Sequence, residues 1–143
     1  MEKLIKILQQ EGCSLVMNCK NERDSGDTGC HIYNGKGVSD LFQLLNGDDN
    51  MLEESRIADK VVGKGAAALM ILGKVREVYA GTISEPALEM LRSYGVPVSY
   101  GQLVPNIINR KGDGICPVET LCLDCDTPEE CFPRISDFIQ KQK

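Results

Sequence analysis

The chain has 143 residues, a formal net charge of −5 and a hydrophobic content of 42%, a composition typical of a single globular domain. Aromatic residues make up only 5% of it and no stretch is rich in Lys and Arg, so the surfaces that bind nucleic acid are missing. No apolar run approaches the roughly 20 residues that span a bilayer, and the start of the chain lacks the features of a signal peptide. We therefore expect one cytoplasmic domain over residues 1–143 that binds neither membranes nor nucleic acid.

The first third of the sequence predicts a helix, a hairpin and a second helix. Residues 2–11 place apolar side chains at helical spacing, and Gly12 ends that helix. Residues 13–19 alternate between two faces and predict a strand, which a polar turn joins to an antiparallel strand at 28–33. A flexible loop then leads into a short helix over 38–46, with Ser39 as its cap.

The middle of the sequence predicts a buried helix, a strand and a capped helix. The predicted buried helix covers 57–72, because its apolar residues recur at helical spacing. These residues are Ala58, Val61, Val62, Gly65, Ala66, Leu69 and Met70. Residues 75–81 predict a strand, and Ser84 predicts the N-cap of a helix that stops at Gly95.

The last third predicts a strand over 96–100, a short helix over 102–109 and another helix that starts near Cys116. Thr127 opens a T-x-x-E capping box for a final helix. The inner face of that helix is expected to carry Cys131, Phe132, Ile135, Phe138 and Ile139. Because helices connect the last strands, we expect parallel pairs within an α/β three-layer sandwich, with a mixed, mostly parallel sheet and helices on both faces.

A candidate ligand site follows from this topology. In an open α/β sheet, ligands bind beyond the carboxyl ends of the parallel strands, where free helix N–H groups favour anionic or carbonyl-bearing ligands. The candidate ligand-binding residues are Asp59, Lys60, Lys64, Ser84, Glu85 and Arg110. Simpler roles exist for each: a solvated helix face for the lysines, an N-cap for Ser84, a favourable helix start for Glu85 and a surface loop for Arg110.

The order of elements resembles the cytidine deaminase fold. The stretches that carry a closer resemblance, to a small prokaryotic family of uncharacterised proteins with that fold, are ADKVVGKGAAA, YAGTISEPALEMLRSYGVPV and NIINRKGDGICPVE. Deaminases bind zinc through H-x-E and P-C-x-x-C motifs, whereas residues 59–61 and 84–86 stand at the corresponding places here. The only histidine, His31, is not part of an H-x-E motif. The resemblance therefore implies a deaminase-like fold without zinc-dependent deamination and without a cofactor.

The seven cysteines allow two other interpretations. Cys116 at a helix start could be a nucleophile, with Glu119 or Glu85 as proton carrier, and a dyad with His31 would require the two to meet in space. Alternatively, a zinc ion or an iron–sulfur cluster could be held by Cys116, Cys122, Cys125 and Cys131. Only one C-x-x-C is present, and free thiols are the default in a reducing compartment.

These observations lead to three hypotheses. The first is a zinc-less deaminase-like domain that binds a small anionic or nucleotide-like ligand in a sensing or regulatory role. The second is a cysteine-dependent enzyme that uses Cys116, and the third is a cysteine-rich metal or interaction module near the C-terminus. A homo-oligomer is compatible with the sequence, which does not predict one.

Overall fold

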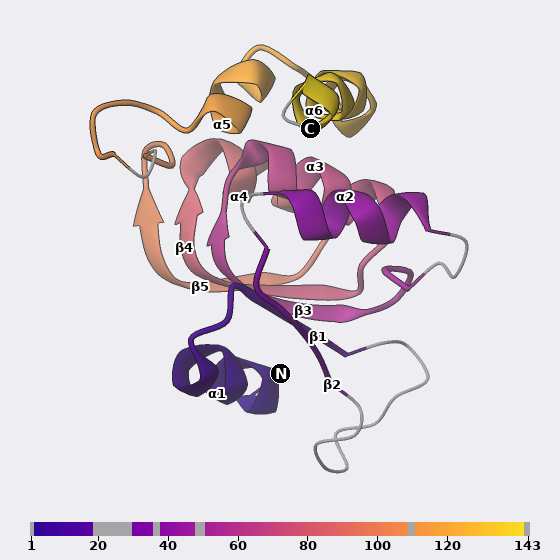
Figure 1. The fold of residues 1–143 in the computed structure, drawn as a ribbon, viewed down its shortest axis with the longest axis vertical. Coiled ribbons are helices and arrows are strands. Elements are labelled where there is room, and N and C mark those ends of the chain that lie inside the picture. Colours follow the sequence, from indigo (N-terminus) through magenta and orange to yellow (C-terminus); the bar gives the residue numbers. More distant parts are fainter. Residues whose placement is uncertain (1, 19–29, 36–37, 48–50, 109–110, 142–143) are drawn as a thin grey trace.

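A computed structural model describes residues 2–18, 30–35, 38–47, 51–108 and 111–141 of the chain (Figure 1). Within these residues the chain forms six helices and five strands, which alternate from α2 to α5. In chain order they are α1 (Glu2–Glu11), β1 (Leu15–Asn18), β2 (Cys30–Tyr33), α2 (Ser39–Asn46), β3 (Arg56–Val62), α3 (Lys64–Leu72), β4 (Glu77–Ser84), α4 (Glu85–Ser93), β5 (Val98–Val104), α5 (Pro117–Cys122) and α6 (Pro128–Lys141).

The five strands form one mixed sheet in the order β2-β1-β3-β4-β5. β1 pairs antiparallel with both of its neighbours, whereas β3, β4 and β5 pair in parallel. The predicted hairpin and the predicted parallel pair of β4 and β5 are both confirmed. Parallel and antiparallel pairs are equal in number, so the sheet is mixed but its pairs are not mostly parallel.

Helices cover both faces of the sheet (Figure 1). α1 contacts β1 and β3 on one face, and α2, α3 and α4 lie on the other. α5 and α6 pack outside α3, so an additional helical layer lies over the expected three. The rings of Phe42 on α2 and Phe132 on α6 stack at 5.7 Å between centroids and join these two layers. No helix in the described part of the chain has the length and apolar character needed to cross a bilayer.

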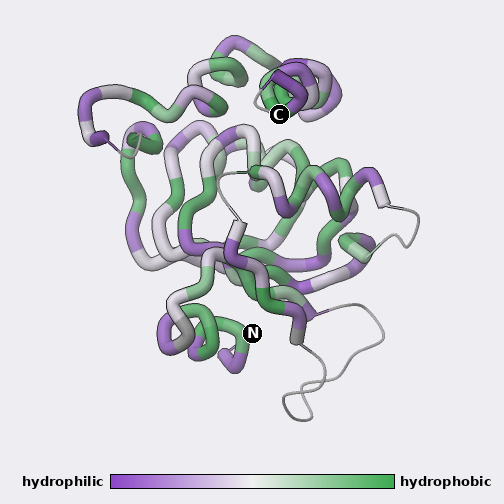
Figure 2. Tube along the Cα trace, viewed as in Figure 1, coloured by the Kyte–Doolittle hydropathy of each residue, from purple (hydrophilic) through white to green (hydrophobic). Residues whose placement is uncertain are grey.

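Two hydrophobic clusters hold the layers together, and hydrophobic residues recur along the strands and the helices that cover them (Figure 2). The larger cluster lies between the sheet and the helices above it and includes Leu69, Met70, Ile83 and Ile135. The smaller cluster lies under α1; its members are Leu4, Leu8, Cys13, Val16 and Ala58. Because β1 contributes to both clusters, all four of its residues are buried. Side chains on opposite faces of one strand thus serve two cores.

The predicted helix over 57–72 is wrong in its first half. Arg56–Val62 form strand β3, and only Lys64–Leu72 are helical. β3 lies between β1 and β4, and its consecutive residues Ile57, Ala58 and Asp59 are all buried, so β3 lacks the alternation that marks a half-buried strand. Gly63, with an extended backbone at φ −96° and ψ 179°, separates strand from helix.

Two further local predictions are wrong, and others are confirmed. The predicted helix over 102–109 is absent, because β5 continues to Val104 and Ile108 instead forms an antiparallel bridge with Ile115. Val38, not Ser39, occupies the N-cap position of α2 and makes no side-chain cap. The Thr127 capping residue is confirmed, since its Oγ1 accepts a hydrogen bond from the Glu130 backbone N–H at 3.2 Å. The predicted polar turn over 20–27 lies outside the described residues.

The parallel strands bend in their second halves, toward α5 (Figure 1). Two glycines lie near the middle of β4 and β5, and neither leaves room for a side chain. A Cβ at Gly81 would lie 2.7 Å from the backbone oxygen of Lys60. A Cβ at Gly101 would lie 3.0 Å from the backbone oxygen of Gly81. The bend brings the carboxyl ends of β3, β4 and β5 to the place where α3, α4 and α5 begin.

Candidate functional site

The starts of α3 and α4 converge, although α3 starts at Lys64 and not in the predicted region near Asp59 and Lys60. The chain's own Glu119 fills the space between the two helix starts. Glu119 Oε1 accepts hydrogen bonds from the Lys64 backbone N–H at 2.9 Å and from Ser84 Oγ at 2.6 Å. Its Oε2 accepts a hydrogen bond from the Ile107 backbone N–H. The side chain of Glu119 is buried, with 1% of the residue exposed. We call these four residues the Glu119 junction.

The Glu119 junction has a simple electrostatic basis. Helix N-termini leave backbone N–H groups without partners and carry partial positive charge, so a carboxylate is stabilised there. Ser84 is the N-cap of α4, as predicted, and its Oγ also accepts a hydrogen bond from the Ala87 backbone N–H at 3.3 Å. A hydroxyl can accept one hydrogen bond and donate another. Ser84 therefore links the start of α4 to Glu119.

Lys64, a predicted ligand for an anion, is used inside the chain. Its Nζ donates hydrogen bonds to the backbone oxygens of Leu123 at 3.0 Å and Cys125 at 2.6 Å. The residue is 9% exposed, and its ammonium group holds the backbone of the segment that follows α5. Lys64 and Ser84 are brought together as expected, at a place where internal groups already satisfy both.

The other predicted site residues lie farther from the junction. Lys60 is exposed on β3 at the level of Gly81, three positions before Ser84 in the strand register. Glu85 is exposed in the first turn of α4. Arg110 lies outside the described residues, so its predicted role stays a prediction.

Asp59 lies within β3, where it pairs with Leu15 and Ala80. It is 7% exposed, and its Oδ1 accepts a hydrogen bond from the Val61 backbone N–H at 3.3 Å. Burial raises the pKa of the Asp59 carboxyl from 3.8 to about 8; backbone hydrogen bonds lower it and the charge of Asp40 raises it further. Asp59 is therefore mostly protonated at neutral pH and acts as a neutral polar group.

An open pocket of about 450 Å³ lies beside the Glu119 junction, at the carboxyl ends of the parallel strands. Its lining residues are Val61, Thr82, Val104, Pro105, Asn106, Ile107, Ile108 and Ile115. Three of them are large apolar residues with substantial exposure: Val61 at 41%, Ile108 at 55% and Ile115 at 39%. We call this the strand-end pocket. Val61 and residues 104–108 of this lining fall within predicted helices, and no pattern in the sequence indicates the pocket.

The sequence predictions miss Glu119 and the strand-end pocket. Val61 and residues 104–108 are predicted to be helical, whereas Val61 lies near the end of β3 and residues 104–108 start at the end of β5, with β4 between the two strands. Glu119 was considered only as a proton carrier for Cys116. The signal that could have identified it is an acid between Val118 and Cys122, two residues that are buried on α5. An acid on a buried face requires several hydrogen-bond donors, and helix starts provide them.

The cysteines of the C-terminal segment do not form one cluster. Cys116 is partly exposed at the N-cap of α5, and its backbone N–H donates to the Ile107 oxygen at 2.8 Å. The others, Cys122, Cys125 and Cys131, are buried. A hydrogen bond between the thiols lowers the pKa of Cys122 and raises that of Cys131, while burial raises the pKa of Cys125 to about 11. Within the described residues, no group of three or more His, Cys, Asp or Glu is placed to hold a metal ion.

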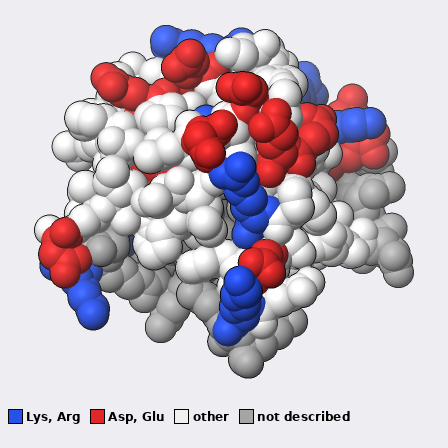
Figure 3. All heavy atoms as spheres, turned by 90° about the horizontal axis from the view of Figure 1, so that it is seen from above, with Lys and Arg blue, Asp and Glu red and all other residues white. Residues whose placement is uncertain are grey.

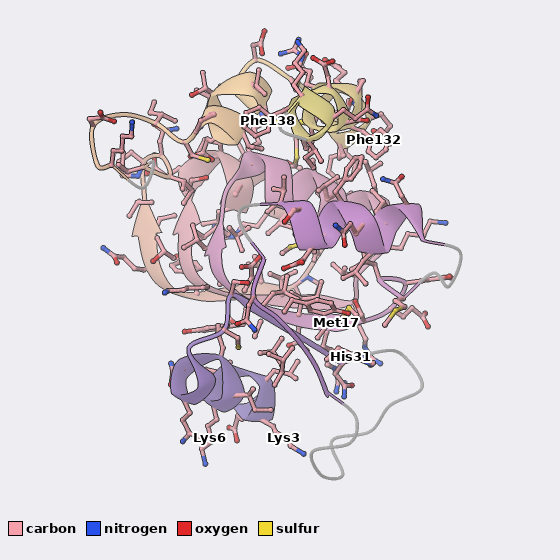
Figure 4. All side chains as sticks on the ribbon, in the orientation of Figure 1. Lys3, Lys6, Met17, His31, Phe132 and Phe138 are labelled. Carbon is pink, nitrogen blue, oxygen red and sulfur yellow. The ribbon has the colours of Figure 1, made fainter. Side chains whose placement is uncertain are left out.

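The structure does not bring Cys116 and His31 together. His31 lies on β2 at the far edge of the sheet (Figure 4), whereas Cys116 precedes α5 on the side of β5.

The face formed by α5 and α6 carries acidic and basic side chains, with acidic ones more numerous in the view of Figure 3. Its exposed acids include Asp124, Asp126 and Glu129.

Comparisons with known proteins identify the family. A family model described as a domain of unknown function (DUF1893), TM1506, matches residues 3–139. The crystal structure of a DUF1893 family protein (TM1506) from Thermotoga maritima is similar, with a TM-score of 0.81 and 29% sequence identity, over 95% of this chain and 87% of that chain. No curated protein matches. The chain therefore belongs to the DUF1893 family.

Proposed function

We propose that this chain is a zinc-less domain with a cytidine-deaminase-like fold that binds a small anionic or nucleotide-like ligand in the strand-end pocket, in a sensing or regulatory role. The observation that carries the proposal is the pocket itself, which lies at the carboxyl ends of β3, β4 and β5. This is where open α/β sheets bind their ligands. Its volume of about 450 Å³ is within the range of small-molecule sites.

The lining of the strand-end pocket favours a flat, partly apolar ligand. Ile107, Ile108 and Ile115 offer an apolar wall for a ring, and Thr82 and Asn106 are the polar side chains in the lining. A few polar groups in an apolar pocket orient a ligand, as is usual for such sites. A hydroxyl and an amide both donate and accept hydrogen bonds, which suits the edge of a nucleobase.

A cation near the strand-end pocket supports the anionic part of the proposal. Lys111 is exposed in the segment that connects the bridged residues Ile108 and Ile115. Lys60 is also exposed, but it directly precedes the lining residue Val61 in β3, so its side chain points to the opposite face of the sheet. Lys64 is not included, because its Nζ donates hydrogen bonds to two backbone oxygens.

The Glu119 junction argues for binding without metal chemistry. In the deaminase resemblance, residues 84–86 stand where the zinc-binding cysteines would begin, and here Ser84 bonds to Glu119. All three donors of the junction are directed at that carboxylate. Glu119 is thus an internal acceptor that fixes the wall behind the pocket, because Ile107 belongs to both.

A ligand screen tests the proposal. Thermal unfolding would be measured with a panel of nucleosides, nucleoside monophosphates and phosphorylated sugars. We expect at least one compound to raise the Tm of the wild type. Ile108→Glu, which places a carboxylate at the pocket wall, should abolish the shift. Ile32→Glu is a matched control, because Ile32 is similarly exposed at 47% but lies on β2.

Two outcomes would overturn this proposal. One is that no compound of the panel shifts the Tm of the wild type. The other is that the shift persists in Ile108→Glu, which would place the ligand elsewhere. Chromatography of the bound compound after overnight incubation tests the sensing role, since we expect it to be recovered unchanged.

A further inference from the structure

The free edge of β5 lacks the features that usually protect an edge strand. Val98–Val104 is seven residues long and contains no charged residue and no proline. Its five central residues are exposed. Natural proteins usually block such edges with lysine, proline, a bulge or a short strand, because an edge pairs readily with another strand. The opposite edge, β2, comprises four residues in the part of the chain that the structure describes.

A groove runs beside this edge, between β5 and α4. It has a volume of about 540 Å³ and is lined by Glu85, Leu88, Glu89, Arg92, Ser93 and Leu103. Leu103, 40% exposed, is the residue of β5 that lines the groove. We call these groove residues, Leu103 included, the α4–β5 face.

The charges of α4 would be complementary to those of α4 in a second copy of the chain related by a twofold rotation. Glu85 lies in the first turn of the helix, Glu89 at its middle and Arg92 in its last turn. Among the described residues, none of the three forms an ion pair within the chain. Two antiparallel copies of α4 would place Glu85 of each copy opposite Arg92 of the partner subunit. Antiparallel helix dipoles favour the same arrangement.

We infer that the α4–β5 face is the surface through which two copies of this chain associate, with β5 paired antiparallel to β5 and α4 packed against α4. Neighbouring strands are about 4.8 Å apart, and packed helices about 8–10 Å apart. Because α4 contacts both β4 and β5, pairing of the two edges brings the two α4 helices to packing distance. The two five-stranded sheets then become one continuous sheet.

The dimer is independent of the proposed ligand site. Leu103 lines the groove with α4, whereas the next residue, Val104, lines the strand-end pocket on the other face of the sheet. Successive residues of a strand point to opposite faces. A substitution at Leu103 therefore tests association without entering the pocket.

Sedimentation and light scattering measure the association directly. At about 50 μM, we expect the wild type to have twice the chain mass of 15.7 kDa. Leu103→Lys puts a cation at the seam of the dimer and should raise the dissociation constant at least tenfold. Ile32→Lys is the matched control on the β2 edge and should remain dimeric.

A charge exchange identifies the contacts. Arg92→Glu leaves only acids at the three α4 positions, and the double variant Glu85→Arg, Glu89→Arg leaves only bases. Each variant alone should associate at least tenfold more weakly than the wild type, and an equimolar mixture should recover the dimer. Circular dichroism confirms that each variant is folded. A monomeric wild type, or a dimer that tolerates all these changes, would overturn the inference.

Discussion

The strand-end region and the middle of β3 each contain a buried carboxyl group, and the two groups differ in how many hydrogen bonds they accept. Glu119 accepts hydrogen bonds from two backbone N–H groups and one hydroxyl. Asp59 accepts one from Val61, lies within reach of the charge of Asp40 and has its pKa raised to about 8. Both residues are less than a tenth exposed, at 1% and 7%.

The difference is explained by the supply of hydrogen-bond donors. The first turns of helices have N–H groups that no helical carbonyl uses, and Glu119 lies where two helices start. Asp59 lies in a central strand, whose N–H groups are largely used by β1 and β4. A buried carboxyl group that few donors reach retains its proton instead of its charge. The strand ends are thus suited to an anion, and the strand middle to a neutral acid.

The largest effect on stability is expected for Glu119→Ala, which removes the carboxyl group that accepts more hydrogen bonds. Three donors of the Glu119 junction would lose their common acceptor inside the protein. Because buried unsatisfied donors are costly, we expect a loss of about 4 kcal/mol in the free energy of unfolding. Urea unfolding at pH 7 measures it.

Glu119→Gln is the matched control for that experiment. Its amide oxygen can replace one carboxylate oxygen, but its NH₂ group cannot accept from the Ile107 N–H. The loss should therefore be about half that of Glu119→Ala. If both variants lose less than about 1 kcal/mol, the junction is not the anchor described here.

Asp59→Asn tests the other member of the comparison through pH. Because the pKa of folded Asp59 is raised from 3.8 to about 8, the folded state keeps a proton that the unfolded chain releases between these values. The stability that this proton provides is complete below about pH 4 and is lost as the pH rises through about 8. The wild type should therefore lose stability over this range relative to Asp59→Asn.

The pair is compared by urea unfolding at pH 4, 6 and 8. We expect equal stability at pH 4 and an advantage of about 3 kcal/mol for Asp59→Asn at pH 6, which grows further toward pH 8. The amide retains an oxygen for the Val61 N–H, so little else changes. Parallel stability curves for the two proteins would show that Asp59 titrates normally.

The sequence predicted those parts of the fold that local signals encode. The hairpin, the Ser84 cap, the Thr127 capping residue and the final helix depend on residues close together in the chain. The helix over 57–72 failed because burial on both faces removed the alternation that marks a strand. Val61 and Val62, two β-branched residues just before Gly63, were the available evidence for β3.

The candidate site was predictable only in outline. Convergence of two helix starts follows from the topology, and Lys64 and Ser84 do meet there. The group that they meet, Glu119, is 35 residues beyond Ser84, and no local pattern encodes such a contact. The strand-end pocket depends on how residues after β5 fold back toward Val61, which is equally non-local.

A smaller effect is expected for Ser84→Ala, which removes one of the three donors of the Glu119 junction and the N-cap of α4. We expect a loss of about 2 kcal/mol in the free energy of unfolding, since a cap and a buried hydrogen bond to a carboxylate disappear together. Ser93→Ala is the control, because the Ser93 hydroxyl bonds only to the Glu89 backbone oxygen on an exposed face. Its loss should stay below about 0.5 kcal/mol. Equal losses would mean that Ser84 acts only as a surface cap.

The smallest effect separates the two causes that raise the pKa of Asp59. Asp40→Asn removes the nearby charge, while its amide oxygen can still accept the Gly35 backbone N–H, which lies 2.7 Å from Asp40 Oδ2. Burial is the largest cause and stays in place, so the pKa of Asp59 should fall only slightly. The stability gain at pH 8 should be about 0.5 kcal/mol and should vanish in an Asp59→Asn background. If Asp40→Asn instead restored an ordinary pKa, repulsion between two acids, and not a shortage of donors, would distinguish β3 from the strand ends.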